Sequence, residues 1–139
     1  MCAVVGWFAA QICKIFTGMF RERSFNVITV LFGTGGMPSS HSATVCALAT
    51  GCALQYGFAS AELAISFVVA MVVMRDASGV RWETGEQAKL INKMMNEIFS
   101  GKPEEINTGL KELVGHTPFQ VTMGSLLGIA ISLILWVVR

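Results

Sequence analysis

Charged residues are scarce in this chain. Only 14% of its 139 residues are Asp, Glu, Lys or Arg, and 53% are hydrophobic, whereas about a quarter of a typical soluble domain is charged. A soluble protein of this length has too little interior to hide so much apolar surface. We therefore expect an integral membrane protein, and the length allows one domain, residues 1–139.

Several other features are missing. The net charge is +1, so there is no basic excess with which to bind nucleic acid. The four cysteines form no C-x-x-C pair and lie in apolar stretches, which is typical of small buried residues rather than of a disulfide framework or zinc site. No cluster of metal ligands is visible, so we expect neither a metal nor another cofactor. The N-terminal segment lacks the basic leader and cleavage site of a signal peptide, so we expect a retained first span.

Four apolar segments are long enough to consider as membrane spans. In the last of them, Gly124 and Gly128 form a small-x-x-x-small face suited to close helix packing, which is also compatible with a homo-oligomer. The expected fold is an all-α membrane helical bundle of about four transmembrane helices. The predicted spans run from about Met1 to Phe20, Met37 to Tyr56, Ala61 to Met74 and Val121 to Val138.

The connections between the spans carry most of the polar residues. Between the third and fourth spans, apolar residues recur at helical spacing from about Lys89 to Phe99. This pattern predicts an amphipathic helix that lies on the membrane or against the bundle. A second short helix is predicted from about Pro103 to Val114. The stretch from Arg21 to Gly36 is compatible with either a short helix or a re-entrant piece.

If the four segments cross the bilayer alternately, nine of the ten Lys and Arg residues fall on one side, with only Arg139 opposite. Both histidines, His41 and His116, are expected on that side, which we call the active face. The tendency of positive residues to stay in the cytoplasm explains part of this bias and places the active face there. It does not explain Lys14, which lies inside an apolar segment, because ionisable groups at membrane depth are costly and usually functional.

The most distinctive stretch is GGMPSSHS, residues 35–42. A proline in the first turn of a helix, with serines and free backbone N–H groups beside it, favours phosphate binding. The alternative interpretation is an ordinary helix cap with an incidental histidine.

Pro38-Ser39-Ser40-His41 resembles the Pro-Ser-Gly-His motif of the type-2 phosphatidic acid phosphatase and vanadium haloperoxidase superfamily. The longer runs GGMPSSHSATVCALATG, DASGVRWETGEQAKLIN and LKELVGHTPF resemble its divergent bacterial and plastid membrane branch. The similarity covers most of the chain, from about Gln11 to Gly128.

The first superfamily motif is a lysine, six residues and Arg-Pro. Lys14 and Arg21 have this spacing, with Glu22 in place of the proline. In the second motif, His41 matches the histidine and Ser40 replaces the glycine.

The third superfamily motif is Ser-Arg, five residues, His, three residues and Asp. His116 matches its histidine, but Leu110 stands where the arginine is expected and Gln120 where the acid is expected. Gln120 could accept the ring N–H of the histidine, although it would stabilise an imidazolium less than a carboxylate does. The substitutes that the sequence offers are Arg75 or Arg81 for the arginine and Asp76 for the acid.

The resemblance implies a phosphatase in which His116 attacks phosphorus, His41 protonates the leaving alcohol and water hydrolyses the phosphohistidine. Its substrate would be a lipid or prenyl phosphate at the surface of a bacterial cell membrane. Phosphatidate, phosphatidylglycerophosphate and an isoprenoid phosphate are equally compatible. The expected catalytic residues are His116, His41 and Asp76, and the expected phosphate-binding residues are Lys14, Arg21, Ser39, Ser40 and Arg81.

Two other functions compete with this one. A catalytically silent membrane protein that binds anionic lipid head groups or partner subunits is favoured by Gln120 and by the missing arginine. A small transporter subunit would fit the compact spans, but it predicts an inverted repeat that the sequence does not show.

Overall fold

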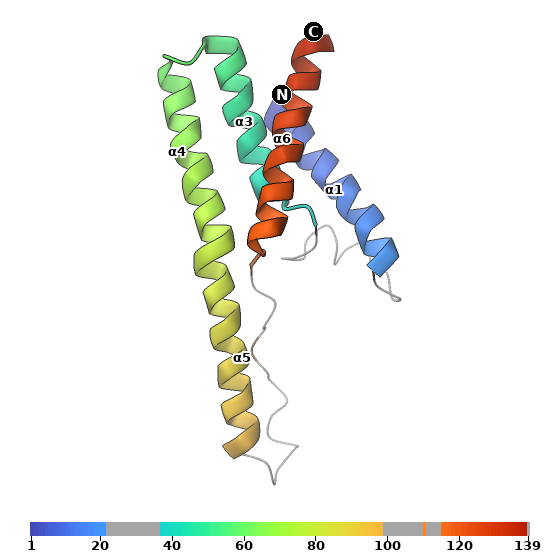
Figure 1. Cartoon of the computed structure of the whole chain (residues 1–139), viewed down its shortest axis with the longest axis vertical. Coiled ribbons are helices and arrows are strands. Elements are labelled where there is room, and N and C mark those ends of the chain that lie inside the picture. Colours follow the sequence, from blue (N-terminus) through green and yellow to red (C-terminus); the bar gives the residue numbers. More distant parts are fainter. Residues whose placement is uncertain (22–36, 99–109, 111–114, 139) are drawn as a thin grey trace.

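The computed structural model describes residues 1–21, 37–98, 110 and 115–138, and it does so without the side chains of residues 18–21. Within these residues every regular element is helical, and none is a strand (Figure 1). The predicted all-α helical bundle is therefore confirmed, and each of the four predicted spans coincides with a helix. In chain order the elements are α1 (Cys2–Arg21), α3 (Ser40–Tyr56), α4 (Ala61–Arg75), the π-helical turn η1 (Asp76–Val80), α5 (Arg81–Ile98) and α6 (Pro118–Val138).

Serine side chains start two of the helices. The hydroxyl of Ser39 accepts the backbone N–H of Ser42 at 3.4 Å to cap α3, and that of Ser60 accepts the N–H of Leu63 at 3.2 Å to cap α4. Both are ordinary N-caps. Pro38 therefore precedes the cap, and the prediction that it lies in the first turn of the helix is wrong.

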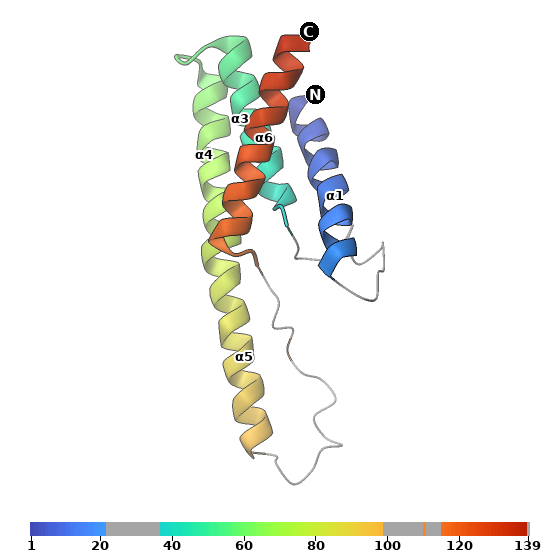
Figure 2. The same ribbon diagram turned by 45° about the vertical axis from the view of Figure 1, so that its right-hand side comes forward.

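Helix α3 lies at the centre of the bundle and packs against α1, α4 and α6 (Figures 1 and 2). Against α6 the contact is between backbones, because a Cβ at Gly124 or Gly128 would overlap the carbonyl oxygens of Ser39 and Ala43. The glycine face of α6 is thus occupied inside the molecule, as close packing of small residues predicts. This face is therefore in contact with α3 of the same chain, and the homo-oligomer stays a prediction.

Small residues also join α1 to α3. A Cβ at Gly6 would come within 2.9 Å of the Cβ of Ala47, which is itself fully buried. On the other side of α3, the hydroxyl of Ser132 donates a hydrogen bond of 2.7 Å to the carbonyl oxygen of Ala47. The core is therefore built from alanine, glycine and serine rather than from large apolar side chains.

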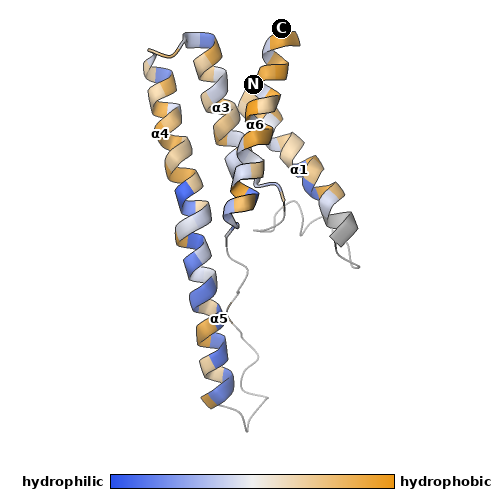
Figure 3. Ribbon diagram, viewed as in Figure 1, coloured by the Kyte–Doolittle hydropathy of each residue, from blue (hydrophilic) through white to orange (hydrophobic). Residues whose placement is uncertain are grey.

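The large apolar side chains point outward instead. Phe8 of α1, Phe67 of α4 and Leu126 of α6 are all more than half exposed, and the upper parts of the helices are mostly apolar (Figure 3). Small residues inside and large apolar ones outside is the arrangement of a bundle surrounded by lipid. By length and composition, α6 and the continuous helix Ala61–Ile98 could each cross a membrane, and α1 has a shorter apolar stretch, Cys2–Thr17. The number of four spans stays a prediction.

Helices α4 and α5 form one rod joined by η1, and this differs from the expected arrangement. The amphipathic helix begins at Arg81 rather than near Lys89, and α5 extends beyond the bundle in line with α4 instead of packing against it (Figures 1 and 2). The π-helical turn continues the helix beyond Met74, where the predicted third span ends. The polar face of α5 holds the returning chain, because the side chain of Asn92 exchanges two hydrogen bonds of 2.9 Å with the backbone of Leu110.

Two predicted features cannot be compared with the structure in full. The stretch 22–36 lies outside the described residues. So does the predicted helix at 103–114, except for Leu110, which is not helical.

Candidate active site

The two histidines lie together where the start of α3 meets the segment before α6. The ring centroids of His41 and His116 are 6.5 Å apart, and the ring planes are inclined by 53°. Alternating spans predict that these two segments, distant in sequence, can meet in space. His41 is on the first turn of α3 and is exposed, whereas His116 is buried.

His116 is held at both its backbone and its ring. Its backbone N–H donates to the carbonyl oxygen of Ala77 in η1 at 3.0 Å. Its ring atom Nδ1 lies 3.2 Å from Oε1 of Gln120, in the first turn of α6. The side chain is therefore fixed in position, since only 6% of its surface is exposed.

The contacts of Gln120 determine which ring nitrogen of His116 carries the proton. The backbone N–H of Thr117 also points at Oε1 of Gln120, at 3.1 Å. A backbone N–H can only donate, so the amide oxygen must be the atom that faces it. His116 Nδ1 meets the same oxygen and must therefore carry hydrogen in the neutral ring. The lone pair of neutral His116 is then on Nε2.

The surroundings of His116 favour its neutral form. Burial lowers its pKa below the ordinary value of 6.5; the hydrogen bond with Gln120 raises it, and the positive charges of Lys14 and Arg81 lower it further, as does His41. The charges act in this direction because cations disfavour an imidazolium. A neutral imidazole with a lone pair on Nε2 is the form that can attack an electrophile.

Lys14 reaches this site from α1. Although Lys14 carries a charge, it is only 5% exposed. Its Nζ donates a hydrogen bond of 3.3 Å to the hydroxyl of Ser40. Ser40 is the first residue of α3 and directly precedes His41. An ammonium group inside an apolar bundle is costly, and the structure places this one beside both histidines.

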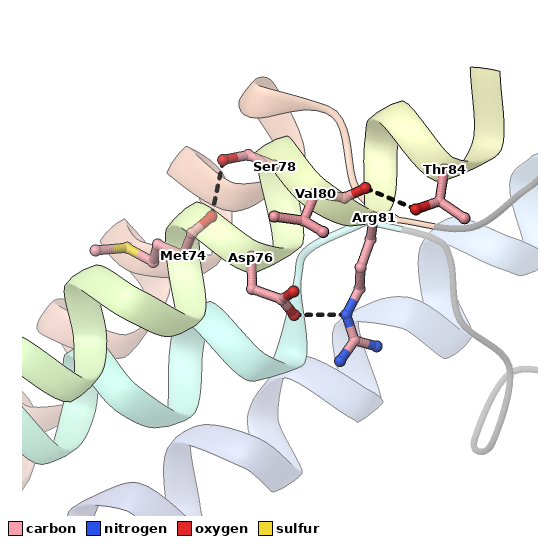
Figure 4. A network of polar contacts seen from close by, with 6 residues as sticks. All are labelled: Met74, Asp76, Ser78, Val80, Arg81 and Thr84. Carbon is pink, nitrogen blue, oxygen red and sulfur yellow. Dashed lines mark hydrogen bonds and ion pairs between the residues drawn. The ribbon is translucent and has the colours of Figure 1, made fainter. Parts of the chain in front are cut away.

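Asp76 and Arg81 pair with each other across η1. Nε of Arg81 lies 2.6 Å from Oδ2 of Asp76, and both side chains are about half exposed (Figure 4). Asp76 was the predicted substitute for the acid that orients the nucleophilic histidine. In the structure the side chain that contacts Nδ1 of His116 is that of Gln120, four residues further along the chain. Asp76 is paired with Arg81 instead.

A sequence profile of the Divergent PAP2 family matches residues 1–131. The chain belongs to this family. An uncharacterized membrane protein of Bacillus subtilis (strain 168), YuiD, is 42% identical over 125 residues, which cover 83% of this chain and 77% of that protein. No solved structure matches the chain.

In this divergent PAP2 protein Ser39 has a different environment from the one expected. It is fully buried, and its hydroxyl accepts hydrogen bonds from the backbone and the hydroxyl of Ser42 at 3.4 and 3.0 Å. Its N–H donates to the carbonyl oxygen of Gln120 at 3.2 Å. These contacts make Ser39 a helix cap that ties α3 to α6, and they leave Ser40 as the serine that faces Lys14.

The remaining predicted basic residues are less closely defined. Arg21 is the last residue of α1, and its side chain lies outside the described part of the chain. Arg75 is exposed at the end of α4. Of the two residues weighed as replacements for the missing arginine, Arg81 is the one whose charge affects His116.

Sequence reasoning missed the contribution of η1 and of Gly115. Gly115 has a φ of +111°, a conformation that favours glycine, and it lies against the backbone of Arg81 and Trp82. The available signal was the glycine directly before a candidate catalytic histidine, which was interpreted only as the end of a short helix.

Proposed function

We propose that this chain is a membrane phosphatase that hydrolyses a lipid or prenyl phosphate monoester through a phosphohistidine on His116. The observation that carries the proposal is the pairing of His41 and His116, whose ring centroids are 6.5 Å apart, with the Nε2 lone pair of His116 set by Gln120. Membership in the Divergent PAP2 family supports the same class of chemistry.

In the first step, Nε2 of neutral His116 attacks phosphorus. An N–P bond forms, and the bond from phosphorus to the leaving oxygen breaks while the His41 imidazolium gives that oxygen its proton. The products are a free alcohol, a phosphohistidine and a neutral His41. The exposed position of His41 at the start of α3 suits a group that must exchange protons with solvent.

In the second step, water attacks the phosphohistidine. Neutral His41 accepts a proton from the water, the N–P bond breaks and inorganic phosphate leaves. His116 returns to its neutral form and His41 to its protonated form, so the two residues are ready for another cycle. His41 therefore serves as the acid when the N–P bond forms and as the base when that bond breaks.

Basic side chains would stabilise the phosphoryl oxygens as charge rearranges. Lys14 brings an ammonium group, and the hydroxyl of Ser40 beside it is a further donor. Arg81 binds Asp76 through Nε, and its guanidinium has further N–H donors on the other two nitrogens. Asp76 then orients Arg81 rather than the nucleophile. Arg21, at the spacing of the first superfamily motif, is the fourth phosphate-binding residue that we propose.

The proposed substrate is a lipid or prenyl phosphate because the site lies at the ends of apolar helices. The bias of Lys and Arg residues toward one side supports an active face in the cytoplasm of a bacterial cell. The phosphate would thus be held at the membrane surface while its apolar tail stays in the bilayer.

Phosphate release from detergent-purified protein tests this proposal. Phosphatidate, phosphatidylglycerophosphate and an isoprenoid phosphate would be offered separately to the wild type, to His41→Ala and to His116→Ala. Lys93→Ala, an exposed substitution on α5, is the control. We expect hydrolysis of at least one substrate by the wild type and by the control, and none by the histidine variants. A folded wild type that releases no phosphate from any of them would contradict the proposal.

A second candidate function follows from Gln120. An amide oxygen stabilises the positive charge that develops on a phosphorylated imidazole less than a carboxylate does. The site would then bind an anionic lipid head group without turning it over. Saturable vanadate or phosphatidate binding that depends on Lys14 and His41, together with no phosphate release, favours this second function.

A further inference from the structure

The π-helical turn η1 leaves one backbone carbonyl without the partner that an α-helix would give it. In an α-helix the carbonyl oxygen of Ala77 accepts the N–H four residues later, which belongs to Arg81. Here the N–H of Arg81 bonds to the carbonyl oxygen of Asp76, five residues earlier. The carbonyl of Ala77 is thereby released from Arg81, and it accepts the N–H of His116 at 3.0 Å.

The segment that carries His116 lies directly on the backbone at the end of this turn. A Cβ at Gly115 would come within 2.7 Å of the backbone nitrogen of Trp82 and 2.8 Å of the carbonyl carbon of Arg81. No other residue type fits such a close approach, and the φ of +111° also requires glycine. The backbone of 115–116 is thus in contact with the turn on two sides.

The same turn sets the position of Arg81. Five residues of an α-helix rotate by about 500°, which would place positions 76 and 81 roughly 140° apart around the axis. The wider π-helical turn brings Asp76 and Arg81 onto one side, where their side chains meet at 2.6 Å (Figure 4). One local feature therefore fixes a backbone atom of the candidate nucleophile and a candidate phosphate-binding side chain.

We propose that η1 is the positioning element of the site: its widened turn presents the carbonyl of Ala77 to the backbone of His116 and holds Arg81 on the same side. Ala77 and Gly115 are then positioning residues that act through His116. The consequence for catalysis rests on the proposed phosphatase function, whereas the hydrogen bond itself does not. Single-turn π-helical insertions are often found at functional sites.

Deletion of Val80 tests the π-helical turn by itself, because it removes the turn and leaves Asp76 and Arg81 in the chain. Val80 is 63% exposed, so its loss leaves no cavity. With one residue fewer the helix can close as an α-helix, in which the N–H of Trp82 takes the carbonyl of Ala77. Asp76 and Arg81 then stand four apart along the helix and can still pair. Val80→Ala keeps the chain length and is the matched control.

Hydrogen exchange at the His116 amide is the first measurement, and it needs no catalytic activity. We expect protection in the wild type and in Val80→Ala, and exchange at least about tenfold faster in the deletion variant, as the loss of one hydrogen bond implies. Unchanged protection of the α3 amides would show that the bundle remains folded. Equal protection of His116 in the wild type and the deletion variant would overturn the inference, whether or not the protein hydrolyses anything.

Hydrolysis is the second measurement. A nucleophile displaced by about 1 Å loses roughly 100-fold in rate, so we expect a fall of this order in kcat with a smaller change in KM. The acid limb of the pH profile should move to higher pH, because a released His116 is better solvated. An unchanged kcat and an unchanged profile in the deletion variant would contradict the positioning role.

Gly115→Ala provides a second variant in case the deletion variant does not fold. Its Cβ would push the segment away from Arg81 and Trp82, so the His116 amide should again exchange faster. Gly57→Ala is the matched control, because Gly57 also has a positive φ, of +84°, but no atom lies within 4 Å of the added Cβ. Faster His116 exchange in both alanine variants, or in neither, would contradict the proposed contact.

Discussion

Gln120 holds the ring of His116 through one oxygen atom, 3.2 Å from Nδ1, and the same oxygen accepts the N–H of Thr117. This arrangement reproduces the geometry by which a carboxylate orients a catalytic imidazole, but it lacks the negative charge. The tautomer of His116 is therefore set, while its protonated or phosphorylated form is less stabilised than it would be beside an acid.

Gln120→Glu should supply the missing charge without changing the length of the side chain. The carboxylate can accept both existing hydrogen bonds and raises the pKa of His116. We expect kcat to rise about tenfold, the equivalent of one pKa unit of extra imidazolium stabilisation. Gln55→Glu, on an exposed glutamine at the other end of α3, should leave the rate unchanged. A Gln120→Glu variant that is slower than the wild type would show that charge at this position does not limit the reaction.

The two neighbouring serines should respond differently to replacement by alanine. Ser39→Ala removes the cap of α3 and should lower the free energy of unfolding by about 1 kcal/mol. Ser40→Ala removes the partner of Lys14 and should lower kcat/KM and vanadate affinity with little loss of stability. Thermal unfolding in detergent and steady-state kinetics measure the two effects. Equal effects of both variants on kcat/KM would contradict the assignment of Ser39 as a cap.

The contact between α3 and α6 should not tolerate a side chain at Gly128. Gly128→Leu forces the backbones apart at Ala43 and should destabilise the fold by about 1–3 kcal/mol or more, as overpacking does. Ala130→Leu, on the exposed side of α6, should have little effect. Because the glycine face is used within one chain, the loss should not depend on protein concentration. A loss that dilution changes would indicate that this face joins two copies instead.

The pH dependence of hydrolysis should reflect the neutral state of His116. Burial lowers its pKa, and the charge of Lys14 adds to the effect, so the imidazole stays neutral to lower pH than usual. The acid limb of kcat/KM that reports His116 should therefore lie below pH 6.5, the ordinary histidine value.

Lys14→Met removes a cation that disfavours the imidazolium, so the pKa of His116 should rise. A ring NMR titration measures this shift independently of turnover. Lys93→Met, on the exposed surface of α5, should leave the titration unchanged. A lower pKa in Lys14→Met would contradict the electrostatic account.

Much of this molecule could be predicted from hydrophobic pattern alone. The apolar runs correspond to α1, α3, α4 and α6, and the assumption that they cross the bilayer alternately placed His41 and His116 on one side, where the structure brings them together. The assignment of His116 as a candidate nucleophile needed the superfamily resemblance as well, since a lone histidine beside a glycine has no distinctive pattern.

The parts that escaped prediction depend on backbone geometry. A π-helical turn has no hydrophobic signature, so the predicted third span ends at Met74, and its continuation through Asp76–Val80 into α5 was not predicted. The sequence places Ser39 and Ser40 side by side and does not show which of them caps α3, whereas in the structure Ser39 is the cap and its carbonyl oxygen lies against Gly124. The pairing of Asp76 with Arg81 follows from the same turn, and it explains why Asp76 does not take the place of the missing acid.

Trapping of the intermediate tests the central claim most directly. Purified protein would be mixed with phosphatidate labelled in its phosphate and quenched in alkali, which preserves phosphohistidine, and the labelled peptide would be identified by mass spectrometry. The account predicts a phosphoryl group on His116 that is absent from His116→Ala. Label on His41, or phosphate release with no labelled histidine at all, would contradict it.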